Sequence, residues 1–213
     1  MKSKLVGSLL LASLSASAGA ATFTLDFEDR PSNTRILDFY NGGQDADGNS
    51  GTNYGVSFGT AAFSSDSLNG VAHSGIHVLG FYDSIFAGVP VINVANGFAD
   101  AFSIYYTAPY VGGTIAIYSG VDKTGVLLGT MNLASTGVGP DPFNPYTTWE
   151  RATLEFIGVA RSIDLGGAVT NVVYDDVTFG SAVPEPATFF YLAIGAALIL
   201  PRAHRHLPDA RRR

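Results

Sequence analysis

The stretch Val173-Tyr174-Asp175-Asp176-Val177-Thr178-Phe179-Gly180 alternates apolar and polar side chains near the end of the chain. Near the start, Phe23-Thr24-Leu25-Asp26-Phe27-Glu28 has the same period. Successive side chains of a strand point to opposite faces, so this period is typical of a strand buried on one side. The two stretches therefore predict the first and the last strand of the fold.

Between these ends the sequence predicts many short strands. Loops rich in Gly, Asn, Asp and Ser, such as 40–53, and the proline-rich loop 139–145 separate them. No convincing helical period occurs between residues 21 and 182. This pattern indicates an all-β fold, a single β-sandwich. The predicted intervening and late strands are 54–58, 76–79, 89–94, 101–107, 114–119, 126–133, 149–157 and 171–179.

The two end stretches also resemble the galactose-binding-like jelly roll of many carbohydrate-binding modules. In that family an early Phe-Glu and a late Asp-Asp-Val meet in the sheet, and here the resemblance spans Thr22 to Gly180. It implies a jelly-roll sandwich with a structural calcium ion between the first and last strands. By position, Glu28 and Asp175 or Asp176 are the implied ligands.

Calcium takes six to eight oxygen ligands, so carbonyls or further carboxylates must complete such a site. On a strand, Asp26 and Glu28 share one face, whereas the adjacent Asp175 and Asp176 point to opposite faces. We therefore expect only one of that pair to join a given site. The alternative is that these residues are ordinary acids on edge strands facing solvent.

The loop Gln44-Asp45-Ala46-Asp47-Gly48-Asn49-Ser50-Gly51 resembles the start of an EF-hand. Asp45, Asp47 and Asn49 occupy the first, third and fifth ligand positions, but Ser50 replaces the required glycine and Val56 the terminal glutamate. An EF-hand is therefore not expected. A flexible polar loop and an irregular calcium site both remain open.

Both ends of the chain are predicted to be targeting segments. Lys2 and Lys4 precede an apolar run, and small residues follow at 16–20, which is typical of a secretory signal peptide. We expect a signal peptide over 1–20, a β-sandwich ectodomain over 21–182 and a sorting segment over 183–213.

The sorting segment has three parts. Val183-Pro184-Glu185-Pro186 is extended by its prolines, residues 187–201 carry no charge, and arginines cluster at the end. The apolar part is shorter than the usual span of about 20 residues, but it suits a membrane helix with its arginines on the cytoplasmic side. A plain C-terminal anchor is the alternative.

This order resembles the PEP-CTERM signal of bacterial surface proteins. The resemblance implies processing by an exosortase, a membrane protease-transpeptidase, with Val183, Pro184, Glu185 and Pro186 as the recognition motif. It also implies export, a temporary anchor in the inner membrane and delivery to the cell surface or beyond.

The charge of the middle region limits its partners. The 213-residue chain has 12 basic and 18 acidic residues, of which 5 and 16 lie between residues 21 and 182, a net charge of −11 there. Nucleic-acid binding needs a basic patch and is not expected. Neutral glycans, exopolysaccharide and calcium are compatible partners. Thiol chemistry is excluded because there is no cysteine.

Catalytic candidates are few, and the sequence predicts no enzyme. His73 and His77 have a spacing that suits metal on a helix, but Ser74-Gly75 lies between them and His77 belongs to the predicted strand 76–79, so we expect them not to converge. A structural role in the envelope or matrix is the main prediction, with a carbohydrate-binding module as the alternative and a hydrolase as a weaker one. Aromatic residues that suit sugar stacking, if exposed, are Tyr40, Tyr54, Tyr82, Tyr105, Tyr106, Tyr110, Tyr118, Tyr146 and Trp149.

Overall fold

The computed structural model describes residues 22–31, 33–66, 72–81, 88–141, 143–166 and 172–180. The predicted signal peptide (1–20) and sorting segment (183–213) lie outside these ranges, so both stay predictions. Among the described residues, no helix is both long and apolar enough to cross a membrane.

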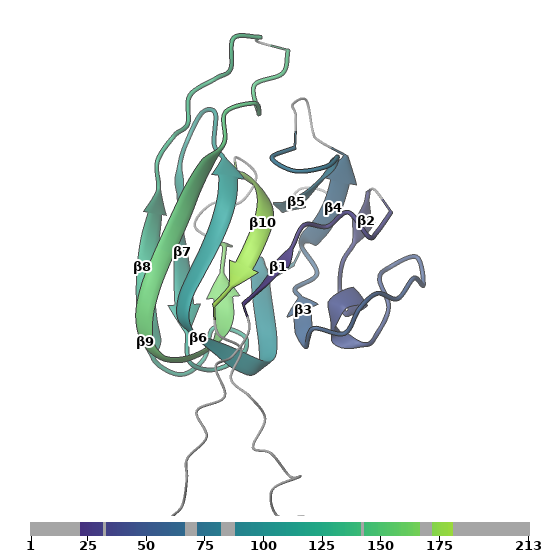
Figure 1. Cartoon of the computed structure of the whole chain (residues 1–213), viewed down its shortest axis with the longest axis vertical. Helices are drawn as coiled ribbons and strands as arrows, with labels where there is room; N and C mark the ends of the chain where they lie inside the picture. The colour runs from purple at the N-terminus through teal and green to yellow at the C-terminus, as the bar shows by residue number, and fades with distance from the viewer. Residues whose placement is uncertain are drawn as a thin grey trace, which may run out of the picture. The chain divides into compact units, whose positions relative to one another are not determined.

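The described chain is all-β, as predicted, and its strands form one antiparallel sheet (Figure 1). The order is β2-β4-β5-β10-β6-β9-β7-β8, with β1 added to β10 and β3 to β6. The sequence predicts neither β2 nor β4. The elements are β1 (Phe23–Leu25), β2 (Thr34–Arg35), the 3-10 turn η1 (Phe39–Asn41), β3 (Val56–Phe58), β4 (Ala62–Asp66), β5 (His77–Phe81), β6 (Val91–Thr107), β7 (Gly113–Tyr118), β8 (Leu127–Leu133), β9 (Glu150–Asp164) and β10 (Val173–Phe179).

Strand β6 is longer than predicted. It joins the predicted strands 89–94 and 101–107 into 17 continuous residues that pair with β9. The register shifts twice along this pairing, and Gly97 and Asp100 have φ angles of 75° and 73°. These are β-bulges, which bend a strand without ending it. Residues 95–100, which separate the two predicted strands, therefore lie inside one strand.

Strand β1 is shorter than predicted. The alternating pattern continues to Glu28, but the strand ends at Leu25. Phe27 has a φ of 63°, and Asp26 Oδ1 accepts the backbone N–H of Glu28 at 3.2 Å. A side chain that captures a backbone donor two residues on forms a turn in place of a strand. Asp26 and Glu28 thus do not share a strand face.

The first and last strands are neighbours, as the resemblance to the jelly roll implies. Phe23 lies opposite Phe179, and Leu25 lies opposite Val177. Strand β10 also pairs with β6 and β5 (Figure 1). The last strand is therefore central: β5 and β6 lie beside its start, and β1 and β6 lie beside its end.

Aromatic side chains fill the core beneath β10. Phe179 packs edge-on against Phe98 and Phe102, with ring centroids 5.3 and 5.9 Å apart, and stacks on Phe23 at 4.8 Å. Phe156 packs on Phe98 from β9 at 5.5 Å. Burying one such side chain contributes about 1.5–3 kcal/mol, so this cluster holds β10 firmly in the sheet.

Candidate functional site

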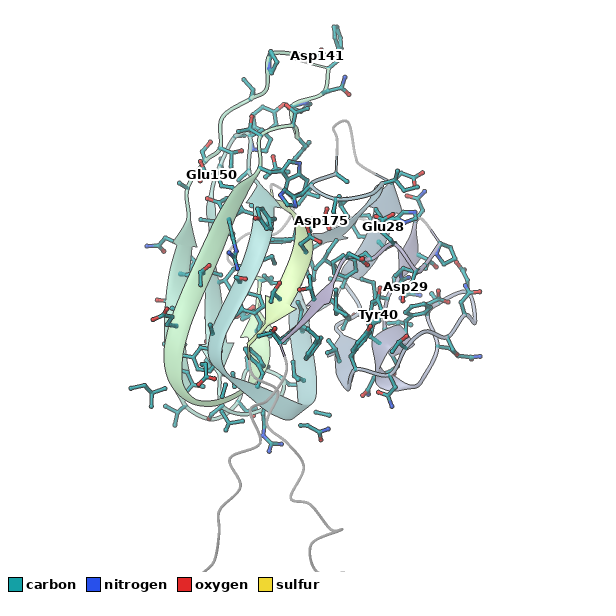
Figure 2. The ribbon with its side chains drawn as sticks, in the orientation of Figure 1. Glu28, Asp29, Tyr40, Asp141, Glu150 and Asp175 are labelled. Atoms are coloured by element: carbon teal, nitrogen blue, oxygen red, sulfur yellow. The ribbon has the colours of Figure 1, made fainter. Side chains whose placement is uncertain are left out.

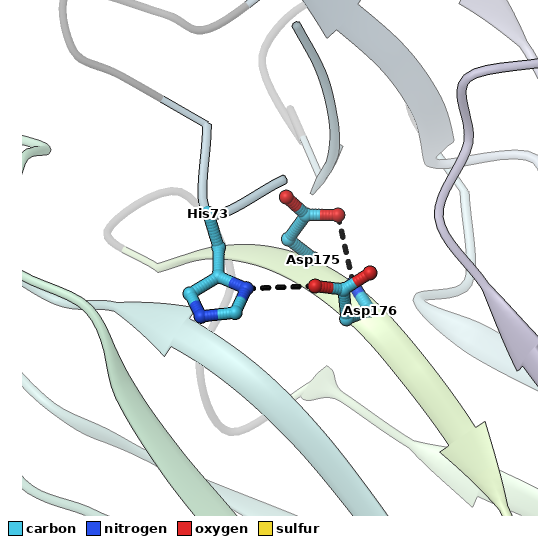
Figure 3. Close-up of side chains that lie close together, drawn as sticks. All are labelled: His73, Asp175 and Asp176. Carbon is cyan, nitrogen blue, oxygen red and sulfur yellow. Dashed lines mark hydrogen bonds and ion pairs between the residues drawn. The ribbon is translucent and has the colours of Figure 1, made fainter. Parts of the chain in front are cut away.

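A polar cluster lies at the start of β10. His73 and Ser74, just before β5, face Asp175 and Asp176 (Figure 3). The Nδ1 atom of His73 lies 2.7 Å from Asp176 Oδ2. The backbone N–H of Ser74 donates to Asp175 Oδ2 at 2.9 Å, and its hydroxyl donates to Asp176 Oδ1 at 3.0 Å. These contacts attach the segment before β5 to the last strand.

A bulge brings both aspartates into this cluster. The pairing of β10 with β6 shifts register between Asp175 and Thr178, and Asp176 has a φ of 45°. One atom each from His73, Asp175 and Asp176 lies within 4.8 Å of the others. The expectation that only one aspartate of the pair joins a given site is wrong for this cluster, because the bulge breaks the regular alternation of side chains.

The carboxyl group of Asp175 is strongly perturbed. The residue is 0% exposed. Burial raises the pKa of Asp175 to about 7, even though it accepts N–H bonds from Ser74 and Asp176; the charge of Asp176 raises the pKa further and His73 opposes this. A buried carboxyl group therefore exchanges its proton near neutral pH.

We expect the fold to lose stability as the pH rises from about 4 to about 7. In this window the folded state keeps a proton on Asp175 that the unfolded chain, with an ordinary pKa of 3.8, has released. The unfolded state then binds fewer protons, so raising the pH favours unfolding, by up to about 1.4 kcal/mol for each unit of pKa difference. Asp175→Asn should flatten this dependence.

Urea unfolding of both chains in chelator, at about pH 4 and about pH 8, measures this effect. The free energy of unfolding of the wild type minus that of the variant should be larger at about pH 4 than at about pH 8. The same pH dependence in both chains would contradict the raised pKa.

Glu28, the third implied calcium ligand, is not part of the cluster of His73, Asp175 and Asp176, because its carboxylate accepts backbone N–H groups. Its Oε1 accepts the N–H groups of Ile76 and His77 at 2.9 and 2.6 Å. Gly75 lies so close that an added Cβ would sit 2.2 Å from the Glu28 carboxyl carbon. Figure 2 shows Glu28 and Asp175 on neighbouring parts of the fold. Both residues thus hold the 73–77 segment, each at its own point.

These residues fit calcium only in part. Two of the three implied ligands converge, but each Asp175 oxygen already accepts a backbone N–H, and the third member of the cluster is the imidazole of His73. Calcium prefers an all-oxygen shell, whereas imidazole suits zinc and similar ions. The calcium site remains a prediction of the resemblance.

His73 and His77 meet different carboxylates. His77 Nδ1 lies 3.7 Å from Glu28 Oε2, and His77 Nε2 lies 3.3 Å from Asp66 Oδ1. His73 faces Asp176. The bend between them points their rings at separate partners, in line with the expectation that they do not converge.

Aromatic side chains flank the polar cluster. The ring of His73 stacks on Tyr105 of β6 at a centroid distance of 3.5 Å and an angle of 17°. Trp149 lies edge-on to His73 at 6.1 Å, and the guanidinium of Arg151 lies 6.0 Å from the centre of the Tyr105 ring. We call His73, Tyr105, Trp149, Arg151 and Asp176 the His73 face.

Sequence reasoning named Tyr105 and Trp149 only among nine aromatic candidates. The bulge at Asp176 and the bend at Ser74 bring His73 onto Tyr105, and neither feature follows from local pattern. Of the other candidates, Tyr40 and Tyr106 are buried, Tyr54 and Tyr110 are exposed, Tyr118 and Tyr146 are half-buried, and Tyr82 lies outside the described residues.

The EF-hand-like loop is built around a buried ion pair. Asp45 Oδ1 accepts the N–H groups of Asp47 and Asn49, each at 2.9 Å, and its Oδ2 lies 3.7 Å from Arg30 Nη2. Both charged side chains of this pair are 0% exposed. Asp47 in turn accepts the hydroxyl of Thr34. The first ligand position is therefore occupied by internal donors, so the loop is an ordered turn.

The buried Tyr40 pairs with an exposed carboxylate. The hydroxyl of Tyr40 donates to Asp29 Oδ1 at 2.6 Å (Figure 2). Burial, together with this hydrogen bond, raises the pKa of Tyr40 far above its ordinary value. Tyr40 is therefore a structural residue, unavailable for stacking on a sugar.

Comparisons with known proteins give weak similarities only. No protein-family model matches the sequence, and no curated protein does. Among solved structures, a carbohydrate-binding module of Cellvibrio mixtus lichenase 5A in complex with cellotriose matches with 11% identity and a TM-score of 0.39, over 59% of this chain and 90% of that one.

Two further structures are similar at the same level. A β-1,3-glucan-binding family 6 module from Bacillus halodurans has 15% identity and a TM-score of 0.41, covering 58% of this chain and 88% of that one. A family 43 arabinoxylan arabinofuranohydrolase from Bacillus subtilis in complex with cellotetraose has 17% identity and a TM-score of 0.40, covering 66% and 32%. These values are too low to assign a family.

Proposed function

We propose that this chain is an exported cell-envelope protein whose jelly-roll β-sandwich binds neutral exopolysaccharide through the His73 face. The observation that carries the proposal is the stack of His73 on Tyr105, with Trp149 at its edge and the Asp176 carboxylate beside it. A sugar ring offers an apolar C–H face and a rim of hydroxyls. Aromatic planes with adjacent hydrogen-bonding groups provide the matching surface.

The electrostatics of the site favour a neutral glycan. The predicted ectodomain carries a net charge of −11. Asp176 adds negative charge next to the aromatic stack, and Arg151 donates to the Ser103 hydroxyl at 3.0 Å. An anionic polysaccharide would be repelled, whereas carboxylate oxygens readily accept hydrogen bonds from sugar hydroxyls.

Tyr105→Ala should weaken binding to the native exopolysaccharide by about tenfold, or about 1.4 kcal/mol, because it removes the platform on which His73 rests. Tyr110→Ala is the matched control, since this tyrosine is 58% exposed on the loop after β6. Affinity electrophoresis in gels containing the polysaccharide gives the two affinities. Equal retardation of both variants would rule out the His73 face.

Binding is favoured over hydrolysis by two features. Gly55-Val56-Ser57-Phe58-Gly59 has the spacing of a hydrolase nucleophile elbow, but Ser57 lies inside β3, opposite Asn93, and not on a strand-to-helix turn. A hollow of about 380 Å³ is lined by Asp100 and Glu155, both exposed. Acid and base roles require carboxyl groups in contrasting environments, which this pair lacks.

The delivery route is part of the proposal and rests on sequence. Residues 183–186 form an extended Val-Pro-Glu-Pro peptide next to an apolar run, the form that a protease cleft accepts. An exosortase-type enzyme would remove the tail after export, and residues 187–201 would hold the precursor in the inner membrane until then.

Glu185→Ala should leave export intact and leave the unprocessed precursor in the inner membrane. The glutamate carries the only charge in the motif, so its loss should remove recognition without changing the apolar run. Immunoblots of membrane and extracellular fractions give the size and place of the product. Normal tail removal in this variant would refute the recognition role.

A further inference from the structure

A second hollow lies at the start of β6, whereas Tyr105 of the His73 face lies near the end of this strand. It has a volume of about 450 Å³, within the usual range for ligand pockets. One wall is apolar, formed by Phe58, Val89 and Val91. The rest of the lining is polar, and this polar wall consists of Thr60, Asn93, Asp122 and Lys123.

The apolar wall of this hollow depends on a close approach between the backbone of Gly59 and that of Val89 and Val91. The N–H of Gly59 donates to the carbonyl of Val91 at 2.8 Å. A Cβ added at Gly59 would lie 1.9 Å from the carbonyl oxygen of Val89, so only glycine fits there. The apolar wall is thus built by β3 and the start of β6.

The polar wall is held in place before any ligand arrives. Asn93 donates from Nδ2 to Asp122 Oδ1 at 2.6 Å and accepts the Asp122 N–H at 2.8 Å. The N–H of Lys123 donates to the buried hydroxyl of Ser162 at 3.0 Å, and that hydroxyl donates to the carbonyl of Gly120 at 2.6 Å. A preorganised wall lowers the entropy lost on binding.

The turn that carries this wall adopts an uncommon conformation. Asp122 and Lys123 are consecutive non-glycine residues with φ angles of 52° and 63°. Left-handed residues of this kind cost about 1–3 kcal/mol each and cluster at ligand sites. Both residues line the hollow.

The polar wall keeps hydrogen-bonding capacity after its internal contacts. Asn93 has a second amide hydrogen and Asp122 has a second carboxylate oxygen. The ammonium of Lys123 has three donors, and it lies 3.4 Å from Asp164 Oδ2. The charges of Asp122 and Asp164 outweigh that of Lys123, so an anionic ligand is disfavoured. The apolar wall, together with a polar wall that offers both donors and acceptors, matches one neutral sugar ring.

We propose that this hollow is a second binding site for a neutral sugar unit, which makes the chain bivalent for glycans. The inference rests on the proposed function, because it assumes that the His73 face binds the first glycan. Asn93 and Tyr105 lie near opposite ends of β6, at most roughly 40 Å apart. Two such separate sites on one chain cross-link polysaccharide strands, since linked sites bind with raised avidity.

The test is calorimetric titration of the full chain with neutral oligosaccharides of glucose and of xylose. Val89→Trp fills the hollow from a side chain that is 47% exposed, and Val111→Trp is its control, at a loop valine that is 60% exposed. Wild type and Val111→Trp should bind two equivalents. Val89→Trp should bind one. Tyr105→Ala should still bind two, one of them about tenfold more weakly, and the double variant should bind only that weakened one.

The outcomes separate the two proposals. A single equivalent that Tyr105→Ala weakens and Val89→Trp leaves unchanged overturns the second site and leaves the proposed function standing. A single equivalent lost only in Val89→Trp supports the hollow and overturns the His73 face. No binding by wild type overturns both. Two equivalents that Val89→Trp leaves intact also overturn the hollow.

Discussion

Asp45→Asn should destabilise the fold by about 3–5 kcal/mol, the usual cost of removing one partner of a buried ion pair. Asp45 and Arg30 are both fully buried side chains. Burial lowers the pKa of Arg30 below its ordinary value, but a guanidinium stays protonated, and it lies 4.9 Å from the centre of the Phe39 ring. Without Asp45 its charge is buried and unpaired. Urea unfolding measures the loss.

Asp141→Asn is the matched control. Asp141 forms the same kind of turn, accepting the N–H of Phe143 at 2.9 Å and the amide of Asn144 at 2.7 Å, but it is exposed. This substitution should change stability by less than about 1 kcal/mol. The loss in Asp45→Asn should also be largely restored by Arg30→Met, which removes the stranded charge. Equal effects of the two asparagine variants would refute the account.

Phe179→Ala should destabilise the fold by about 3–5 kcal/mol and lower the melting temperature by roughly 10 °C. The side chain is 0% exposed and touches rings from β1 and β6. Its removal leaves a cavity where the first and last strands meet. Differential scanning calorimetry measures the shift.

Phe143→Ala is the control for this substitution, because Phe143 is 85% exposed. It should move the melting temperature by no more than about 2 °C. If both alanine variants melt at the same temperature, the cluster around Phe179 does not hold the sheet together.

The bulges were beyond sequence reasoning. Gly97, Asp100 and Asp176 adopt positive φ angles inside strands. Whether such a residue ends a strand or bulges within it depends on whether the partner strand continues to pair, as β9 does along β6. The partner lies about fifty residues away in the chain, so no local window contains the answer.

The sequence by itself determined the all-β class, because a period of two is a local property that any strand buried on one side must show. The pairing of the first and last strands was implied by the resemblance alone, and the structure has it. The sequence also pointed to Asp175 and Asp176. Only the tertiary structure decided that both join His73, which is 103 residues from Asp176. Likewise, only the structure turned Glu28 onto the backbone and buried Asp45 against Arg30. Contacts between distant segments depend on how the whole sheet packs, and residue patterns carry no record of that geometry.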